Sequence, residues 1–334
     1  MRHLRLAWLR DMRHLRLAWL IFTLPFALLP NTANGQEYPT KAVRIVSGFS
    51  AGGSADTVAR LLAQQLSELW GQPVIVENKP GAGGTIGAEF VAKAPPDGYT
   101  LLLGDISINA IAGSLYTNLP YDPIKDFVQV TRLVTFPLVV VVPSSSPIMT
   151  MSDLIARAKA KPGSLRYGSA GVGTSPHVFM EMLNQKAGIS TEAIQYKGSA
   201  PSMTGLLSGD VDYSATSVST AKSFLQAGKL RAIGITSTSS VPGLPSVPPI
   251  ASAVPGYEAL TFHGLHAPAK TPAAIIAKIN RDVQKAMTMP DVRKHFDGLS
   301  LDVSVTSTED YTAYIKQQTE LWGAVIRAAN IRAD

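Results

Sequence analysis

The sequence predicts an α/β protein made of two units, each built on a mostly parallel sheet, that face each other across a central cleft. Short β-rich segments alternate with segments of helical periodicity from residue 43 to residue 236, which is typical of parallel sheets covered by helices. Each unit presents a Gly-rich turn before a helix, at 48–53 and at 170–174. The chain has 334 residues, of which 46% are hydrophobic and 16% charged, so it is large and apolar enough to form two cores.

The first unit opens with a strand over 43–47, followed by a helix over 54–70 for which Ser54 is the expected cap. One face of that helix is apolar at helical spacing, with Val58, Leu61, Leu62, Leu66 and Leu69. The further elements expected here are strands at 74–78, 99–104, 128–133 and 138–142 and a helix at 85–94.

The second unit repeats this order of elements. A helix at 152–161 and a strand at 165–169 lead to the second Gly-rich turn. The next helix is expected from Ser175, its cap, to Gly188, its stop, with Pro176 at the favoured first position. Later elements are strands at 193–196, 211–216 and 230–236, with helices ending at 208 and 227.

The chain is expected to return to the first unit near its end. A strand at 260–267 and helices at 272–288 and 307–328 follow a Pro-rich segment, and Thr306 with Glu309 suggests a capping box. We therefore expect domain 1 to comprise residues 36–140 plus 260–334, and domain 2 to comprise residues 141–259.

Residues 1–35 are predicted to be a secretory signal peptide. Arg13 and Arg16 precede an apolar segment, 17–29, that is too short to span a bilayer comfortably. Small residues at Ala33 and Gly35 favour cleavage before Gln36. An uncleaved anchor helix is the alternative, which the short apolar length disfavours.

The same leader carries most of the basic charge. MRHLRLAWL occurs at 1–9 and again at 12–20, so we take Met12 as the effective start. The net charge is +6, but residues 1–35 hold five arginines and one aspartate, which leaves +2 for the rest of the chain. This balance gives no reason to expect nucleic acid as a partner. The chain has no cysteine, which excludes disulfides and thiol chemistry.

The two Gly-rich turns predict an anion-binding cleft. The first N–H groups of a helix lack intrahelical partners, and the helix dipole is positive there. Glycines let an anion approach that backbone closely. Residues 49–56 would form one half of the cleft, and the hydroxyls of Thr174 and Ser175 would contribute to the other half.

Two other motifs were weighed against this interpretation. Residues 48–52 match the G-x-S-x-G elbow of serine hydrolases, with Ser50 as nucleophile and Asp212 and His263 or His266 as candidate partners. The elbow follows the first strand of the mature chain and has no preceding oxyanion segment, so a tight turn of small residues is the favoured interpretation. Residues 81–87 miss the dinucleotide pattern because Ile86 replaces its third glycine.

The four histidines beyond the leader, at positions 177, 263, 266 and 295, have no metal-ligand spacing. We expect no metal, no cofactor and no catalytic residue.

Several segments together resemble the substrate-binding proteins of tripartite tricarboxylate transporters, also called the Bug family. They are FSAGGSADTVAR, NKPGAGGTIGAE, PPDGYTLLLG, LPYDPIKDF, GSAGVGTSPH, YKGSAP, LRAIGI and GLHAPAKTP, and the likeness covers about residues 38–331. The resemblance implies a periplasmic binding protein fold, in which crossing strands join two α/β domains that close on a small organic anion. It implies a binding protein and not an enzyme, with a carboxylate, amino acid or aromatic acid as ligand.

The resemblance also implies partners and site residues. A membrane permease pair would receive the ligand, or a membrane receptor would read the closed form if the protein is a sensor; we expect a monomer. The residues expected to bind the ligand are Phe49, Ser50, Ala51, Gly52, Gly53, Ser54 and Asp56 in the first loop, Ala170, Gly171, Gly173, Thr174, Ser175 and His177 in the second, Tyr196, Lys197 and Gly198 in a third segment, and Ser107, Asn109, Asp212 and Phe262 elsewhere.

Overall fold

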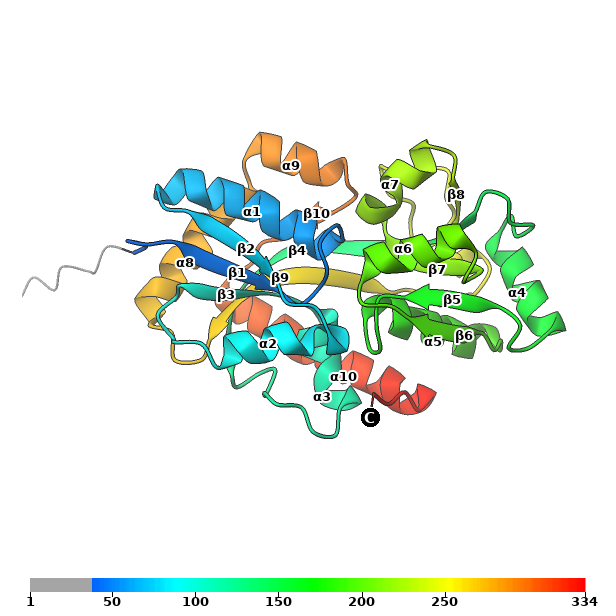
Figure 1. Cartoon of the computed structure of the whole chain (residues 1–334), viewed down its shortest axis with the longest axis horizontal. Helices are drawn as coiled ribbons and strands as arrows, with labels where there is room; N and C mark the ends of the chain where they lie inside the picture. Colours follow the sequence, from blue (N-terminus) through cyan, green and yellow to red (C-terminus); the bar gives the residue numbers. More distant parts are fainter. Residues whose placement is uncertain (1–37, 334) are drawn as a thin grey trace, which may run out of the picture. The chain divides into compact units, whose positions relative to one another are not determined.

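A mixed β-sheet runs through both halves of the protein (Figure 1). The structure is a computed structural model that describes residues 38–333, and the expected signal peptide lies outside the described residues. Residues 39–333 belong to one unit. Its strands are β1 (Val43–Ser47), β2 (Val74–Asn78), β3 (Thr100–Asp105), β4 (Phe127–Pro143), β5 (Arg166–Ser169), β6 (Glu192–Gln195), β7 (Tyr213–Ser217), β8 (Leu230–Ile235), β9 (Leu260–Pro268) and β10 (Asp302–Val303).

The strands follow the order β2-β1-β3-β9-β4-β7-β5-β6, with β8 and β10 also paired to β4. Pairing is parallel among β1, β2 and β3 and among β5, β6 and β7. It is antiparallel wherever β4 or β9 takes part. The sheet is therefore mixed, because two long strands that cross from one half to the other join two parallel groups.

β4 is one continuous strand of 17 residues, where the sequence predicted two strands separated at 134–137. Pro137 is the last residue that pairs with β9, and Leu138 is the first that pairs with β7. Proline has no N–H to donate to a ladder, so it is rare inside a paired strand. In the structure it lies where β4 changes partners, and the strand continues through it.

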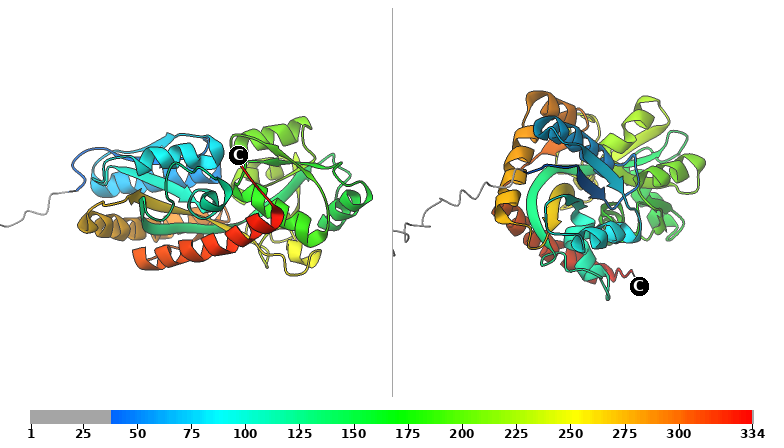
Figure 2. Two further views of the ribbon diagram at one scale, coloured as in Figure 1. Left: turned by 90° about the horizontal axis from the view of Figure 1, so that it is seen from below. Right: turned by 60° about the vertical axis from the view of Figure 1, so that its left-hand side comes forward.

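Helices cover both halves of the sheet. They are α1 (Ser54–Trp70), α2 (Thr85–Ala92), α3 (Ala112–Leu115), α4 (Met151–Ala160), α5 (Ser175–Ala187), α6 (Ser199–Ser208), α7 (Val218–Gln226), α8 (Ala273–Met287), α9 (Pro290–Asp297) and α10 (Thr308–Ala329), with short helices η1 (Ala82–Gly84), η2 (Ser107–Ile111) and η3 (Ile250–Ser252). Figure 2 shows α10, in red, running along one side of the strands. Trp322 of α10 stacks on Phe179 of α5, with ring centroids 4.8 Å apart.

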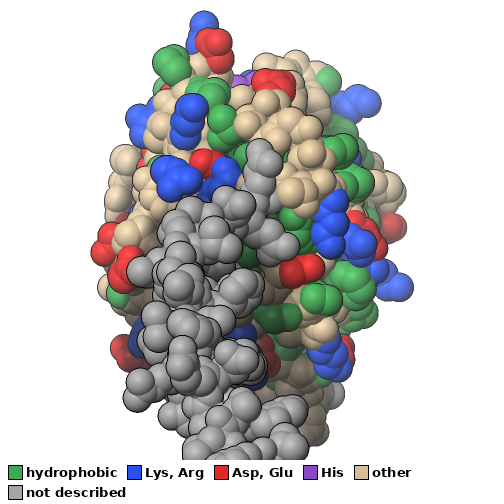
Figure 3. All heavy atoms as spheres, turned by 90° about the vertical axis from the view of Figure 1, so that its left-hand side faces the viewer, with side chains coloured by type: hydrophobic (Ala, Val, Ile, Leu, Met, Phe, Trp, Pro, Cys, Tyr) green, Lys and Arg blue, Asp and Glu red, His purple; other side chains and the backbone are tan. Residues whose placement is uncertain are grey.

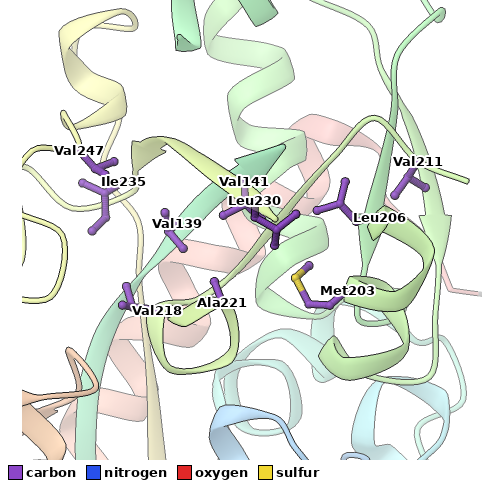
Figure 4. Close-up of a cluster of buried hydrophobic side chains, with 10 residues drawn as sticks. All are labelled: Val139, Val141, Met203, Leu206, Val211, Val218, Ala221, Leu230, Ile235 and Val247. Carbon is purple, nitrogen blue, oxygen red and sulfur yellow. The ribbon is translucent and has the colours of Figure 1, made fainter. Parts of the chain in front are cut away.

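Each half has its own cluster of buried side chains. One consists of Val46, Ala88, Val91, Leu102, Ile108, Tyr121 and Phe127. The other, shown in Figure 4, consists of Val139, Val141, Met203, Leu206, Val211, Val218, Ala221, Leu230, Ile235 and Val247. β4 contributes to both clusters, with Phe127 near its start and Val139 and Val141 near its end.

The surface mixes both charges. Figure 3 shows Lys and Arg side chains interspersed with Asp and Glu on one face, without a uniform basic patch.

Within residues 38–333, no helix is both long and apolar enough to span a membrane.

Candidate functional site

A narrow cavity lies where the two predicted Gly-rich loops meet the crossing strands. Its lining consists of Phe49, Ser50, Gly53, Ser54, Ala55, Asp105, Phe136, Leu138, Ala170, Thr174, Ser175, Pro176, Ser199, Ser217, Thr261 and His263. The space open to the centre of a water molecule is about 40 Å³. One water needs roughly 10–15 Å³ by the same measure, so the cavity has room only for a compact group.

Four helices begin at this cavity. Its lining includes the first residues of α1, α5 and α6, which are Ser54, Ser175 and Ser199, and the residue that precedes α7, Ser217. No side-chain cap bond closes α1, α5 or α6, whereas Ser217 accepts a hydrogen bond from the Thr220 N–H. Three helix N-termini therefore have first-turn N–H groups without a cap, and their dipoles favour an anion.

Ser54 and Ser175 are not the caps that the sequence suggested. The cap positions are Gly53 and Thr174, and the two serines are the first helical residues. Their hydroxyls point instead to β9. Ser54 Oγ lies 2.9 Å from His263 Nε2, and Ser175 Oγ lies 2.9 Å from Thr261 Oγ1. β9 thus holds the start of one helix from each half of the molecule.

Among residues 38–333, Asp105 is the one acidic residue of the lining, and no Lys or Arg belongs to that lining. It ends β3 and lies directly opposite His263 of β9 in the antiparallel ladder. Burial raises the pKa of Asp105 to about 7, although hydrogen bonds from Ile108 and Ser107 act in the opposite direction. Burial lowers the pKa of His263 to about 3, so this imidazole is neutral at neutral pH.

The structure brings seven of the predicted binding residues onto the cavity. They are Phe49, Ser50, Gly53, Ser54, Ala170, Thr174 and Ser175. The ligand-binding residues predicted from the sequence do not include the other nine lining residues, which are Ala55, Asp105, Phe136, Leu138, Pro176, Ser199, Ser217, Thr261 and His263. Position could have revealed Asp105 and Ser217, because each directly follows the strand predicted before it and ligands gather at such strand ends.

A second group of predicted residues lies beside the cavity. Gly171, Tyr196 and Lys197 line a neighbouring hollow together with the turn at 81–84. Gly198 packs against Ser50, because a Cβ atom placed there would lie 3.0 Å from Ser50 Oγ. Ala51 and Gly52 of the first loop are exposed and absent from the cavity lining.

Other predicted residues support the loops and are absent from the lining. Asp56 accepts hydrogen bonds from the Gly52 N–H at 3.1 Å and from Arg60 Nε at 3.0 Å. The Gly173 N–H donates to His177 Nδ1 at 3.1 Å, which ties the second loop to α5. Both contacts hold a Gly-rich loop to the first turn of its own helix.

Ser107 and Asn109 belong to the short helix after β3. Ser107 Oγ donates to Asp105 Oδ2 at 3.0 Å, and Asn109 is buried beneath Gly104. Ser107 therefore contacts a residue of the lining, while neither side chain belongs to the lining itself.

Asp212 and Phe262 lie elsewhere. The Asp212 carboxylate accepts the Arg166 N–H at 2.7 Å. Phe262 packs edge-on against Tyr311 and Tyr314 of α10, since alternation along β9 points it away from the side of Thr261 and His263.

The geometry does not form the serine-hydrolase arrangement. Ser50 donates its hydroxyl to the carbonyl of Lys197. The nearby imidazole of His263 contacts Ser54 instead, and its lowered pKa makes it a poor general base. Among residues 38–333, no cluster of His, Asp and Glu has the geometry of a metal site.

The chain is similar to known proteins over most of its length. Residues 58–331 match the tripartite tricarboxylate transporter family receptor. The UPF0065 protein in the tcbD-tcbE intergenic region of Pseudomonas sp. (strain P51) is 35% identical over 299 residues, which cover 89% of each chain.

Two solved structures share the fold. R. palustris Rpa4515, solved with adipate, is 32% identical with a TM-score of 0.86, and the match covers 88% of this chain and 99% of that one. MatC from Rhodopseudomonas palustris, solved with bound malate, is 31% identical with a TM-score of 0.82, and the match covers 86% and 100%. The predicted α/β periplasmic binding protein fold is confirmed, and the chain belongs to the family of tripartite tricarboxylate transporter receptors that its loop segments resemble.

Proposed function

We propose that this protein is a periplasmic solute-binding protein that captures a small organic anion in the cavity between its Gly-rich loops and delivers it to a membrane permease pair. Its family is one of transporter receptors, and two similar proteins were solved with the carboxylates adipate and malate. The observation that carries the proposal is the convergence of helix N-termini on a cavity whose lining, within residues 38–333, includes no Lys or Arg. A carboxylate would be held there by N–H groups and hydroxyls.

The ligand contacts proposed here come from both halves of the chain. Ser50 and Ser54 belong to the first loop, and Thr174 and Ser175 to the second. We also propose that domain 1 comprises 36–140 plus 260–334, that domain 2 comprises 141–259, and that a ligand bridging them favours the closed form. A ligand shifts such a balance only by its differential affinity for the two forms.

Export is part of this proposal. The full chain, expressed in a Gram-negative host with its own leader, is expected to accumulate in the periplasm. N-terminal sequencing of that material should begin at Gln36. Recovery of uncleaved protein in the membrane fraction would instead support an anchor helix.

A thermal-shift screen of the periplasmic product tests the function. The panel contains adipate, malate, amino acids and aromatic acids. A ligand at about one hundred times its Kd adds roughly 2.7 kcal/mol of stability, which is a readable change in Tm. A protein free of co-purified ligand that responds to no acid of the panel would contradict the proposal.

A charge placed at the start of α1 tests the site. Ser54→Asp adds a carboxylate where the ligand anion is expected, while Asp remains a favourable residue in the first turn of a helix. Two like charges about 4 Å apart near a surface repel by roughly 4 kcal/mol, so the affinity for the best acid of the screen should fall at least about 100-fold. Ser54→Asn is the matched neutral control and should lose less than about tenfold by calorimetry. Equal losses in the two variants would remove Ser54 from the anion site.

A further inference from the structure

We propose, on the basis of the proposed function, that the ligand carries a protonated nitrogen as well as a carboxylate, and that the buried carboxylate of Asp105 receives this nitrogen. The ligand would then be a compact amino acid or a similar zwitterion. Asp105 would be the residue that selects it over a plain organic acid.

The position of Asp105 supports this assignment. Its side chain lies on the same face of the sheet as the directly opposite His263, and both line the cavity on which the helix N-termini converge. Asp105 is only 5% exposed, so the surface that it keeps faces a confined space. One ligand therefore meets uncapped helix N-termini and a carboxyl group within the same small cavity.

The capping role of Asp105 does not explain why its side chain carries a negative charge. Its Oδ2 accepts from Ser107 Oγ and its Oδ1 accepts from the Ile108 N–H, both at 3.0 Å. A neutral asparagine could accept the backbone hydrogen bond equally well. The Ser107 Oγ, the Ser107 N–H and the Ile108 N–H occupy three of the roughly four acceptor positions of the carboxylate, which leaves one for another donor. The negative charge itself is thus not required for the cap.

No protein cation neutralises Asp105. Within residues 38–333, the ion pairs of the structure do not include it. Tyr121 after α3 and Tyr311 on α10 interact electrostatically with Asp105, and His263 lies directly opposite it on β9. Burial favours the neutral form of all three groups. A buried carboxylate without a partner is unfavourable, and a ligand ammonium would supply the missing charge.

The same carboxylate would reject a plain acid. An anion held at the helix N-termini would face a like charge across a cavity with little room for water. An acid with an ammonium group would place opposite charges at both ends of the site. Selectivity would then arise from repulsion of the wrong ligand as well as from attraction of the right one.

Calorimetry on pairs of compounds that differ by one amino group tests this inference. The pairs are L-alanine with propionate, L-aspartate with succinate, and L-glutamate with glutarate, measured with the mature wild type at pH 8. In at least one pair we expect the amino compound to bind at least about 30-fold more tightly. Asp105→Asn keeps the cap and removes the charge, so the preference should fall below about threefold. Asp153→Asn changes the capping-box aspartate of α4, which does not line the cavity, and should leave the preference intact.

A pH series on the wild type gives a second readout that needs no variant. Burial raises the pKa of Asp105 to about 7, so ionisation between pH 6 and pH 8 should strengthen binding of the amino compound. Plain acids that bind as tightly as their amino partners, or more tightly, overturn the inference and leave the proposed function standing. Silence of every pair and of adipate and malate overturns both.

Discussion

Two buried histidines on β9 give the protein a stability that depends on pH. His263 and His266 are each buried, and burial alone lowers the pKa of each to about 3. Their Nδ1 atoms have no hydrogen-bond partner within the described part of the chain, residues 38–333. His266 Nε2 lies 3.0 Å from the Tyr311 hydroxyl. In the unfolded chain these imidazoles have a pKa near 6.5, so the unfolded state binds protons that the folded state does not.

The resulting stability is fully present above pH 6.5 and is lost as the pH falls toward 3. At pH 5 each buried histidine should lower the free energy of unfolding by roughly 2 kcal/mol relative to pH 7.5. His266→Gln should therefore lose less stability than the wild type between pH 7.5 and pH 5, measured by urea unfolding. His295→Gln changes an exposed residue and should follow the wild type. Parallel pH curves for His266→Gln and the wild type would contradict a neutral buried imidazole.

At the scale of residues, the sequence predicts the loops that form the cavity better than it predicts the individual side chains that line it. Seven predicted residues reach the cavity because Gly-rich turns before helices carry a local signal. His263 was named as a possible hydrolase partner and was not among the predicted ligand-binding residues, and Thr261 was not singled out. Alternation along β9 separates them from Phe262, but the sequence does not say which face of the strand is turned toward the loops. Only tertiary packing decides that.

At the scale of elements, the best-predicted boundaries have local causes. β1, α1 and β2 begin and end where the sequence placed them, and Gly188 stops α5 in a left-handed conformation with φ of 61°. The cap of α10 is Ser307, paired with Asp310, one residue after the expected capping box. The sequence prediction missed α9, although Pro290 at its first position and Asp291 in its first turn are local signals for a helix start. It also divided β4, whose continuity depends on the strands that lie alongside.

The stack of α10 on α5 predicts a large effect on stability. Trp322 is 2% exposed and stacks on Phe179, whereas its neighbour Leu321 is 52% exposed. Trp322→Ala should cost about 3–5 kcal/mol in the free energy of unfolding, from lost burial and the cavity left behind. Leu321→Ala is the control and should cost less than about 1 kcal/mol in the same urea titration. Equal losses would mean that the stack contributes little.

At the scale of the whole molecule, the loops of the two halves meet directly. Ser50 donates to the carbonyl of Lys197, and Gly198 lies against Ser50. Gly198 has φ of +127°, and a Cβ atom there would crowd the first loop. We infer that this contact forms on closure around the ligand and separates when the domains open.

Gly198→Ala should consequently weaken ligand binding. We expect at least about a tenfold loss of affinity, because the added methyl group opposes the closed form. Gly228→Ala is the matched control, since Gly228 also has a positive φ of 65° but no neighbouring atom within 4 Å of its added Cβ. That control should change affinity by less than about threefold, although both variants strain the backbone. A similar affinity loss in both would attribute the effect to strain alone.

The course of the chain through β4 and β9 also sets an order of assembly. The strands β5 to β8 of the second half come from one continuous stretch of sequence, whereas the sheet of the first half needs β9 and β10, which follow residue 259. A chain that is synthesised from its N-terminus therefore begins its first half first and completes that half last. Until residues 260–303 arrive, β3 lacks its neighbour β9 and exposes an unpaired edge. Newly synthesised protein should thus depend on holding chaperones for longer than its contiguous half would require alone.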